Sequence, residues 1–359
     1  MVWHLPGPVL STDGQWREDA WIDEGRITYR APSARAEQIP GWVVPGLVDV
    51  HCHIGLDSGG EVDRSTAEDQ AVAARNTGML LARDAGVPSD TQWMQERLDL
   101  PRIVRSGRHI ARPKRYLRYF AEELPQVSDL PEAVAHQARR SQGWVKLVAD
   151  WIDRDVGDLT PLWPTDILRD AVARAHELGV RVTAHTFSHE ALPGLLEAGI
   201  DGIEHACGAD QELAAEIASR GIPVTPTLLQ VDTFLDIAAQ AGEKYPIYGQ
   251  RMRNLHAQRY ETVKMLFDAG VQLYVGTDAG GTLRHGLIAQ EAAEMVRAGI
   301  PTSEVWAAAT WKGREFLRAP ALEEGDPADL IIYDRDPLQD INTMREPSSI
   351  FLNGKPIAF

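Results

Sequence analysis

Four histidines and one aspartate stand out as residues whose types and positions could carry out chemistry. His51 and His53 form a His-x-His pair, whereas His185, His205 and Asp278 each end a short apolar run. Divalent ions such as zinc bind imidazole nitrogens and carboxylate oxygens. Because such an ion lowers the pKa of bound water toward ~7, this set of residues indicates a metal-dependent hydrolase.

The positions of these residues carry the prediction, since a single histidine in a strand is usually a hydrogen-bonded core residue. Apolar runs of strand length recur through the central part of the chain and alternate with segments of helical periodicity. One helix is expected over 166–178 and ends at Gly179, a residue type common at helix C-termini. The expected strands are Leu47–His53, Met79–Asp84, Ile103–Ser106, Val145–Ala149, Val180–His185, Gly202–His205, Ile222–Thr227 and Leu273–Asp278.

Eight strand–helix units within residues 46–321 predict an α/β protein with a (β/α)8 barrel, the TIM-barrel architecture. In such barrels the active site lies at the carboxyl ends of the strands, where all five candidate ligands fall. Lys146 lies in the fourth expected strand. A doubly wound sheet is the alternative, but no Gly-x-Gly-x-x-Gly sequence follows the first strand.

The two ends of the chain have a different character. Residues 1–45 and 322–359 contain short strand-like segments separated by turns, such as Arg26–Tyr29 and Leu330–Tyr333. Such ends can pair with each other in one small composite β-sandwich beside the central domain. The predicted organisation is therefore a sandwich of residues 1–45 and 322–359 and a barrel of residues 46–321.

Composition and charge restrict the class of protein. The formal net charge of −16 disfavours binding to a polyanion such as DNA. No apolar run approaches the ~20 residues needed to span a bilayer, and the N-terminus lacks a signal-peptide pattern. Two cysteines, Cys52 and Cys207, provide no disulfide framework, so a cytoplasmic location is expected. The expected partner is a small-molecule substrate, and the sequence leaves open whether the chain forms a homo-oligomer.

Several motifs resemble those of the amidohydrolase superfamily, within which the imidazolonepropionase-like and Xaa-Pro dipeptidase-like group is the most similar. The resemblance spans nearly the whole chain and implies a distorted (β/α)8 barrel with a composite β-sandwich. The motifs are Val-Pro-Gly-Leu-Val-Asp-Val-His-Cys-His at 44–53, Ala-His at 184–185, Ile-Glu-His at 203–205, Gly-Thr-Asp-Ala-Gly at 276–280 and Gly-Asp-Pro-Ala-Asp-Leu at 325–330.

The resemblance also implies a set of roles for these residues. His51, His53 and Asp278 would hold one metal ion, most simply zinc, and His185 and His205 a second. Lys146, carboxylated by CO2, would bridge the two ions as a carbamate. Asp278 would act as general base and then as general acid. The alternative for Lys146 is a lysine that makes structural hydrogen bonds at the barrel.

The predicted reaction is hydrolysis of a carbon–nitrogen amide bond, linear or cyclic, in a small substrate such as a dipeptide or an N-acyl amino acid. The chain after His185 reads Thr-Phe-Ser-His and lacks the glutamate typical of superfamily deaminases. One alternative is a mononuclear ring-opening hydrolase of the imidazolonepropionase type, and another is a lactone or ester hydrolase. A non-catalytic scaffold is disfavoured because all five ligand positions are filled.

The substrate side of the predicted site has a less specific signal. A local basic cluster follows the third expected strand, and Arg108, Arg112 and Arg115 within it could bind a substrate carboxylate through paired hydrogen bonds. His285, in the loop after the last expected strand, could also face the substrate. The alternative for the arginines is a solvated surface.

Overall fold

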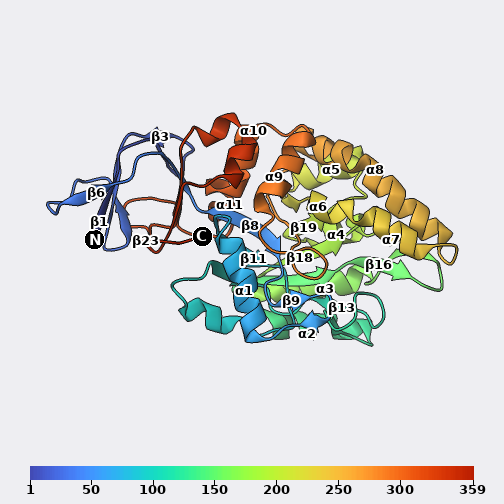
Figure 1. Ribbon diagram of the computed structural model, residues 1–359. Coiled ribbons are helices and arrows are strands. Elements are labelled where there is room, and N and C mark those ends of the chain that lie inside the picture. The colour runs from blue at the N-terminus through green and yellow to red at the C-terminus, as the bar shows by residue number, and fades with distance from the viewer.

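The computed structural model describes residues 1–359, and strands from both ends of the chain lie together beside a larger helix-rich part (Figure 1). One sheet has the order β5-β4-β1-β6 and consists of β1 (Val2–Leu5), β4 (Ala20–Asp23), β5 (Arg26–Thr28) and β6 (Ala36–Gln38). The other has the order β23-β22-β21-β7-β2-β3 and consists of β2 (Val9–Leu10), β3 (Trp16–Arg17), β7 (Trp42–Pro45), β21 (Leu330–Tyr333), β22 (Ser349–Leu352) and β23 (Lys355–Pro356).

The second sheet joins the two chain ends directly. Strand β21 runs antiparallel to β7, with Leu330 opposite Pro45 and Tyr333 opposite Trp42. Alternate residues of β4 are buried, as expected for a strand that covers a core on one face. Ile22 of the first sheet and Leu330 of the second belong to one buried apolar cluster. The two ends therefore share a core, while the expected domain boundaries stay a prediction.

Parallel strands form the centre of the larger part, in two sheets ordered β12-β11-β8 and β14-β13-β15-β18-β19-β20. Their strands are β8 (Leu47–Cys52), β11 (Met79–Asp84), β12 (Arg102–Arg105), β13 (Ile110–Ala111), β14 (Glu122–Glu123), β15 (Trp144–Val148), β18 (Arg181–Thr186), β19 (Gly202–His205) and β20 (Val224–Thr225). Seven of the eight expected strands are thus present, the seventh shortened to two residues.

The eighth expected strand, Leu273–Asp278, is not a regular strand. The segment makes isolated parallel bridges instead, from Leu273 to Val224 of β20 and from Ala279 to Cys52 of β8. The Val50 amide also donates to the Val275 carbonyl at 3.0 Å. Asp278 has a φ of 55°, which interrupts the extended backbone. The segment connects the two sheets in an α/β fold, and closure into an eight-stranded barrel stays a prediction.

Helices surround these strands (Figure 1). The expected helix 166–178 is observed one residue earlier at both ends, and Gly179 follows it with a φ of 71°. None of the helices has the length and apolar character required of a membrane span. The helices are α1 (Arg64–Arg75), α2 (Leu130–Ala138), α3 (Thr165–Glu177), α4 (Leu192–Ala198), α5 (Gln211–Ser219), α6 (Leu228–Asp232), α7 (Phe234–Ala241), α8 (Pro246–Asp268), α9 (Ile288–Arg297), α10 (Thr302–Ala309) and α11 (Trp311–Phe316).

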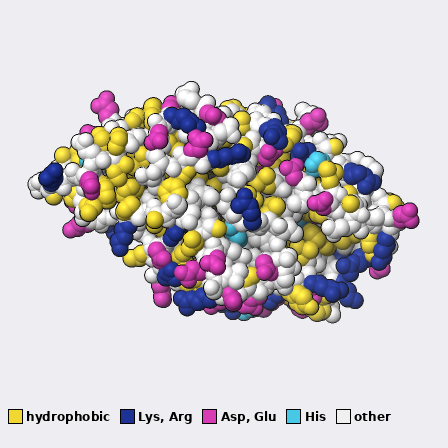
Figure 2. Space-filling view, in the orientation of Figure 1, with side chains coloured by type: hydrophobic (Ala, Val, Ile, Leu, Met, Phe, Trp, Pro, Cys, Tyr) yellow, Lys and Arg dark blue, Asp and Glu magenta, His cyan; other side chains and the backbone are white.

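Short elements in the connections complete the fold. Two hairpins follow strands β8 and β15, and four 3-10 helices lie elsewhere in the connections. On the face seen in Figure 2, acidic and basic side chains are interspersed and no continuous basic area is visible. The short elements are β9 (Leu56–Asp57), β10 (Gly60–Glu61), β16 (Asp150–Asp153), β17 (Asp158–Pro161), η1 (Gln92–Glu96), η2 (Val127–Asp129), η3 (Pro337–Gln339) and η4 (Ile341–Arg345).

Candidate metal centre

The five candidate ligands lie together at the carboxyl ends of the parallel strands. The Asp278 Oδ1 atom is 3.1 Å from His51 Nε2 and 3.0 Å from His53 Nε2. On the other side, His185 Nδ1 is 3.0 Å from His205 Nε2. The rings of His51 and His205 connect the two groups, with centroids 5.2 Å apart. The sequence therefore folds into one cluster with two groups of donors.

The orientation of His53 is defined by a backbone carbonyl. Its Nδ1 is 2.8 Å from the Gly86 carbonyl oxygen, which can only accept a hydrogen bond. The proton of the neutral ring is therefore on Nδ1, and the Nε2 lone pair faces the Asp278 carboxylate. With the ring neutral, Nε2 and the Asp278 oxygen, 3.0 Å apart, are both free to bind a cation placed between them.

His51 has an equivalent arrangement with a carboxylate as its partner. Its Nδ1 donates to Glu204 Oε2 at 2.8 Å, so its Nε2 lone pair also faces Asp278. Glu204 is fully buried and additionally accepts from Arg83 and from the Thr183 hydroxyl. A carboxylate that receives the proton of a ligating histidine fixes the ring and makes the opposite nitrogen a better ligand.

His185 and His205 belong to the second group of donors. His205 Nδ1 lies 2.6 Å from the Thr227 hydroxyl oxygen, which fixes the plane of that ring. His185 Nε2 is buried and has no hydrogen-bond partner, and the nearest acidic oxygen, on Asp150, is 3.7 Å away. A buried ring nitrogen without a partner is unusual and indicates a position where a further group binds.

Lys146 lies between the two groups, on β15. Its Nζ is 3.3 Å from His51 Nε2, and its side chain is buried without a carboxylate within ion-pair distance. Burial lowers the pKa of this lysine to about 8. A lysine that loses its proton easily is suited to react with CO2 or to act as a neutral donor.

Burial also determines the charge of the other members. It holds the pKa of His185 well below the usual value and lowers that of His205 to about 3. Although burial acts to raise the pKa of Asp278, the adjacent His51 and His53 rings hold it well below its usual value. The neutral imidazoles of His185 and His205 and the ionised carboxylate of Asp278 are donors suited to a divalent cation.

Three residues of this centre have left-handed backbone conformations. The φ angle is 70° at His205, 49° at Thr227 and 55° at Asp278, and none of the three is glycine. Each such conformation costs ~1–3 kcal/mol and persists only where surrounding contacts hold it. The local sequence thus turns these side chains inward at the ends of their strands at the expense of backbone strain.

Of the predicted substrate residues, the three arginines lie outside the donor cluster. Arg108 donates to the carbonyls of Tyr119 and Phe120, and Arg112 donates to that of Pro125. Arg115 donates to Asp153 and to the Trp151 carbonyl. These donors already have acceptors within the protein, and carboxylate recognition by the arginines stays a prediction.

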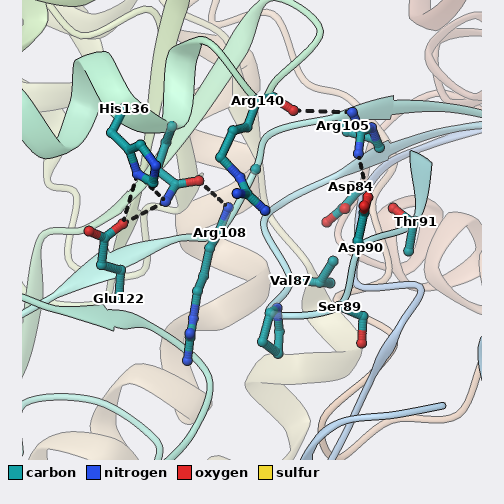
Figure 3. Close-up of a pocket in the computed structure, with 13 residues that line it drawn as sticks. Asp84, Val87, Ser89, Asp90, Thr91, Arg105, Arg108, Glu122, His136 and Arg140 are labelled. Carbon is teal, nitrogen blue, oxygen red and sulfur yellow. Dashed lines mark hydrogen bonds and ion pairs between the residues drawn. The ribbon is translucent and has the colours of Figure 1, made fainter.

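Two of the predicted positions lie in pockets next to the centre. Arg108 contributes to a polar pocket that also contains Arg105, Arg140 and Asp84, and none of the five candidate ligands lines it (Figure 3). His285 is buried, and burial lowers its pKa to about 4. It lines a different, more open pocket between α1 and the loop after Asp278.

Comparison with known proteins assigns the chain to a family. The model of the amidohydrolase family matches residues 42–357. The chain belongs to the amidohydrolase family. As a member of that family, it is a hydrolase that acts on carbon–nitrogen bonds, in agreement with the class predicted from the sequence motifs.

Relatives of this amidohydrolase include proteins with and without a known activity. An uncharacterized protein of Mycobacterium tuberculosis is 48% identical over 337 residues, which cover 93% of this chain and 90% of that protein. Ochratoxinase of Aspergillus niger is 27% identical over 235 residues, 62% of this chain and 47% of that protein. The crystal structure of a Xaa-Pro dipeptidase with bound methionine has a TM-score of 0.84 at 20% identity, covering 99% and 100% of the two chains.

Sequence reasoning left out several residues that shape the centre of this amidohydrolase. Glu204 and Thr227 orient two ligating candidates, and Asp150 accepts from the Phe187 and Ser188 amides in the loop after His185. A charged residue inside an apolar strand, as in Ile-Glu-His, was the available signal for Glu204. No comparable signal marks Asp150, because its partners lie 37 and 38 residues away.

Proposed function

We propose that this amidohydrolase uses two divalent metal ions, most simply zinc, to cleave an amide bond of a small substrate at the mouth of a (β/α)8 barrel. One observation carries the proposal. The Nε2 atoms of His51 and His53 converge on one carboxylate oxygen of Asp278, an arrangement of three donor atoms that suits a bound cation.

The donor set fits such ions. His51, His53 and Asp278 each offer one atom to a common point, with all three atoms within 4.8 Å of one another. His185 Nδ1 and His205 Nε2, which lie 3.0 Å apart, offer the second set. When bound, the metal ions polarise the scissile carbonyl and lower the pKa of the attacking water.

Lys146 is proposed to bridge the two sets as a carbamate. It is a buried amine between them, and a buried ammonium without an ionic partner is costly. Addition of CO2 to the neutral amine forms an N–C bond and releases one proton, which leaves an anionic carboxylate at this position. Such a group supplies two oxygens, one for each donor set.

Asp278 is proposed to transfer the proton. Its carboxylate borders the cavity above the cluster, where it can accept a proton from the attacking water. The same carboxyl then donates the proton to the leaving nitrogen as the carbon–nitrogen bond breaks. Because the proton leaves with the nitrogen of the product, Asp278 is a base again after each cycle.

A hydrolysis screen tests this function. Zinc-loaded protein would be assayed with N-acyl amino acids, Xaa-Pro dipeptides, aryl amides, hydantoin-like rings and lactones. We expect turnover of amides that is lost in His185→Ala and kept in His189→Ala, an exposed histidine in the following loop. Full activity of His185→Ala, or turnover of lactones alone, would contradict the proposal.

A further inference from the structure

The polar pocket of Figure 3 lies beside the metal centre, where strands β11 and β12 end. Asp84 ends β11, Thr91 follows in the next loop, Arg105 ends β12, and Arg140 lies just after α2 (Figure 3). The pocket has a volume of about 240 Å³, which has room for an ion with several waters, since one water needs only ~10–15 Å³. It shares no lining residue with the cavity above the donor cluster, so a ligand here is separate from the substrate.

Two arginines bring positive charge to this pocket. Arg140 extends into the space between the other lining residues and has no carboxylate within ion-pair distance (Figure 3). Arg105 pairs with Asp90 at 3.2 Å, but the Asp90 side chain is 68% exposed, and such a pair contributes little. Arg105 Nε is also buried without a hydrogen-bond partner. Both guanidinium groups therefore have donors left for a ligand that accepts hydrogen bonds.

Two buried side chains in the wall of the pocket keep polar groups free. Asp84 and Thr91 are each only 1% exposed. One carboxyl oxygen of Asp84 accepts from the Gly86 amide at 2.7 Å, and the other has no partner within the protein. Burial raises the pKa of Asp84 to about 8, so its free oxygen carries a proton at neutral pH and can donate it in a hydrogen bond. The Thr91 hydroxyl makes no hydrogen bond within the protein, and free buried groups of this kind indicate a polar ligand.

The other charged residues of the pocket lie away from this part of it. Glu122 accepts from the buried Gln137 amide at 2.5 Å, on the side of the pocket opposite Arg105 (Figure 3). Arg108 donates to two backbone carbonyls, and its side chain points away from Arg105 and Arg140 (Figure 3). The region near Arg105 and Arg140 is therefore rich in donors.

We infer that this pocket binds a small oxyanion, such as phosphate or a short dicarboxylate, between Arg105 and Arg140. Guanidinium groups bind the oxygens of such anions through paired, charge-assisted hydrogen bonds. Asp84 and Thr91 donate to the same anion from the wall of the pocket. The anion is a second ligand of the protein, bound apart from the reacting amide.

The anion supports the metal centre through the loop of residues 86–91. The Gly86 amide donates to Asp84, and the Gly86 carbonyl accepts from His53 Nδ1 at 2.8 Å. An anion held by Asp84 and the arginines thus restrains the residue that orients His53. The expected effect is on stability, because a ligand that binds only the folded protein raises its melting temperature.

Titration calorimetry with inorganic phosphate tests the inference. We expect zinc-loaded protein, freed of excess zinc, to bind phosphate with a Kd of about 1 mM or lower, with sodium chloride at equal ionic strength as the blank. Arg140→Gln should weaken this binding at least about tenfold, because it removes a charge-assisted contact. Arg139→Gln changes the neighbouring exposed arginine, which lies near Glu132 outside the pocket, and should bind phosphate as the wild type does.

The pair of arginine variants separates this pocket from the metal ions, which can also bind phosphate. Phosphate held by the metal ions would bind equally to Arg140→Gln and to the wild type, and that result would overturn the inference. Absence of phosphate binding by the wild type would overturn it as well. Equal weakening in Arg139→Gln and Arg140→Gln would show a general effect of surface charge and would also contradict a site at Arg140.

Thermal melts provide a second measurement and show that each variant is folded. Phosphate should raise the melting temperature of the wild type and of Arg139→Gln, and should leave that of Arg140→Gln nearly unchanged. Arg105→Lys keeps the charge but lacks the paired guanidinium donors, so it should weaken binding as well. Malonate in place of phosphate distinguishes the two kinds of oxyanion, since the one that binds more tightly and depends on Arg140 identifies the ligand class. An equal rise of the melting temperature in Arg140→Gln and the wild type would contradict the inference.

Discussion

At the scale of single residues, a carbonyl, a carboxylate and a hydroxyl orient three of the four imidazoles. The Gly86 carbonyl fixes the orientation of the His53 ring, and the Glu204 carboxylate fixes that of His51. The Thr227 hydroxyl fixes the orientation of the His205 ring. Each contact is made through Nδ1, so in each case Nε2 faces the interior of the cluster. The ligand residues alone do not account for a metal site. The hydrogen-bond partner of Nδ1 in each ring determines that Nε2 is the nitrogen available to bind a metal ion.

Asp278 is expected to be indispensable for turnover. In Asp278→Asn the amide can neither accept the proton from water nor return it to the leaving nitrogen, and kcat should fall by at least about a hundredfold. The variant should keep its fold, as measured by circular dichroism. The exposed Asp57 provides the control variant, Asp57→Asn, which should keep wild-type kcat. Near wild-type turnover by metal-loaded Asp278→Asn would show that another residue is the base.

Lys146→Ala tests the proposed bridge. Removal of the side chain should cost most of the activity, because the two donor sets lose the group between them. Formate, acetate or propionate could occupy the vacated space and restore part of the rate, compared with chloride at equal ionic strength. Lys114→Ala, at an exposed lysine, serves as the control. A folded and fully active Lys146→Ala protein would exclude Lys146 from the chemistry.

At the scale of elements, helix α9 supports the centre from a distance. Glu291 of α9 is buried and accepts from the Leu228 and Leu229 amides at the start of α6, at 2.7 and 2.9 Å. The residue immediately before α6 is Thr227, whose hydroxyl contacts His205. The Glu291 side chain therefore stabilises both the start of α6 and the strained turn that presents Thr227.

Glu291→Ala should consequently destabilise the protein and impair the centre. Two amides at the start of α6 would lose their acceptor, which costs ~1–3 kcal/mol for each buried group. Urea unfolding should show this loss relative to Gln290→Ala, a half-buried neighbour on the same helix. The variant should also bind zinc more weakly. Stability equal to that of Gln290→Ala would contradict a capping role for Glu291.

The elements that bear the candidate ligands could be predicted largely from sequence, because buried parallel strands have apolar runs that end in polar residues. The expected helix 166–178 agrees within one residue with α3. The segment 273–278 was expected to be a strand but is not a regular one, because the Asp278 backbone leaves the extended conformation. The acceptors of Arg115 could not be predicted, since Trp151 and Thr160 lie 36 and 45 residues further along the chain.

At the scale of the whole molecule, the two ends of the chain pair with each other beside the central part. Strand β7 leads directly into β8, which carries His51, and β7 also pairs with β21 from the other end. This pairing joins segments almost 290 residues apart, and it makes the first ligand-bearing strand continuous with a terminal sheet. Short strand-like segments at both ends predicted such pairing, whereas its register required the three-dimensional structure.

The metal content of the purified protein tests the central claim most directly. Protein prepared without chelator and supplied with zinc would be analysed by elemental mass spectrometry against its concentration from amino-acid analysis. Two ions per chain are expected, because His51, His53 and Asp278 form one donor set, His185 and His205 another, and Lys146 lies between them. One ion per chain would favour the mononuclear alternative, and a folded protein that binds no divalent ion would contradict metal-dependent hydrolysis at this site.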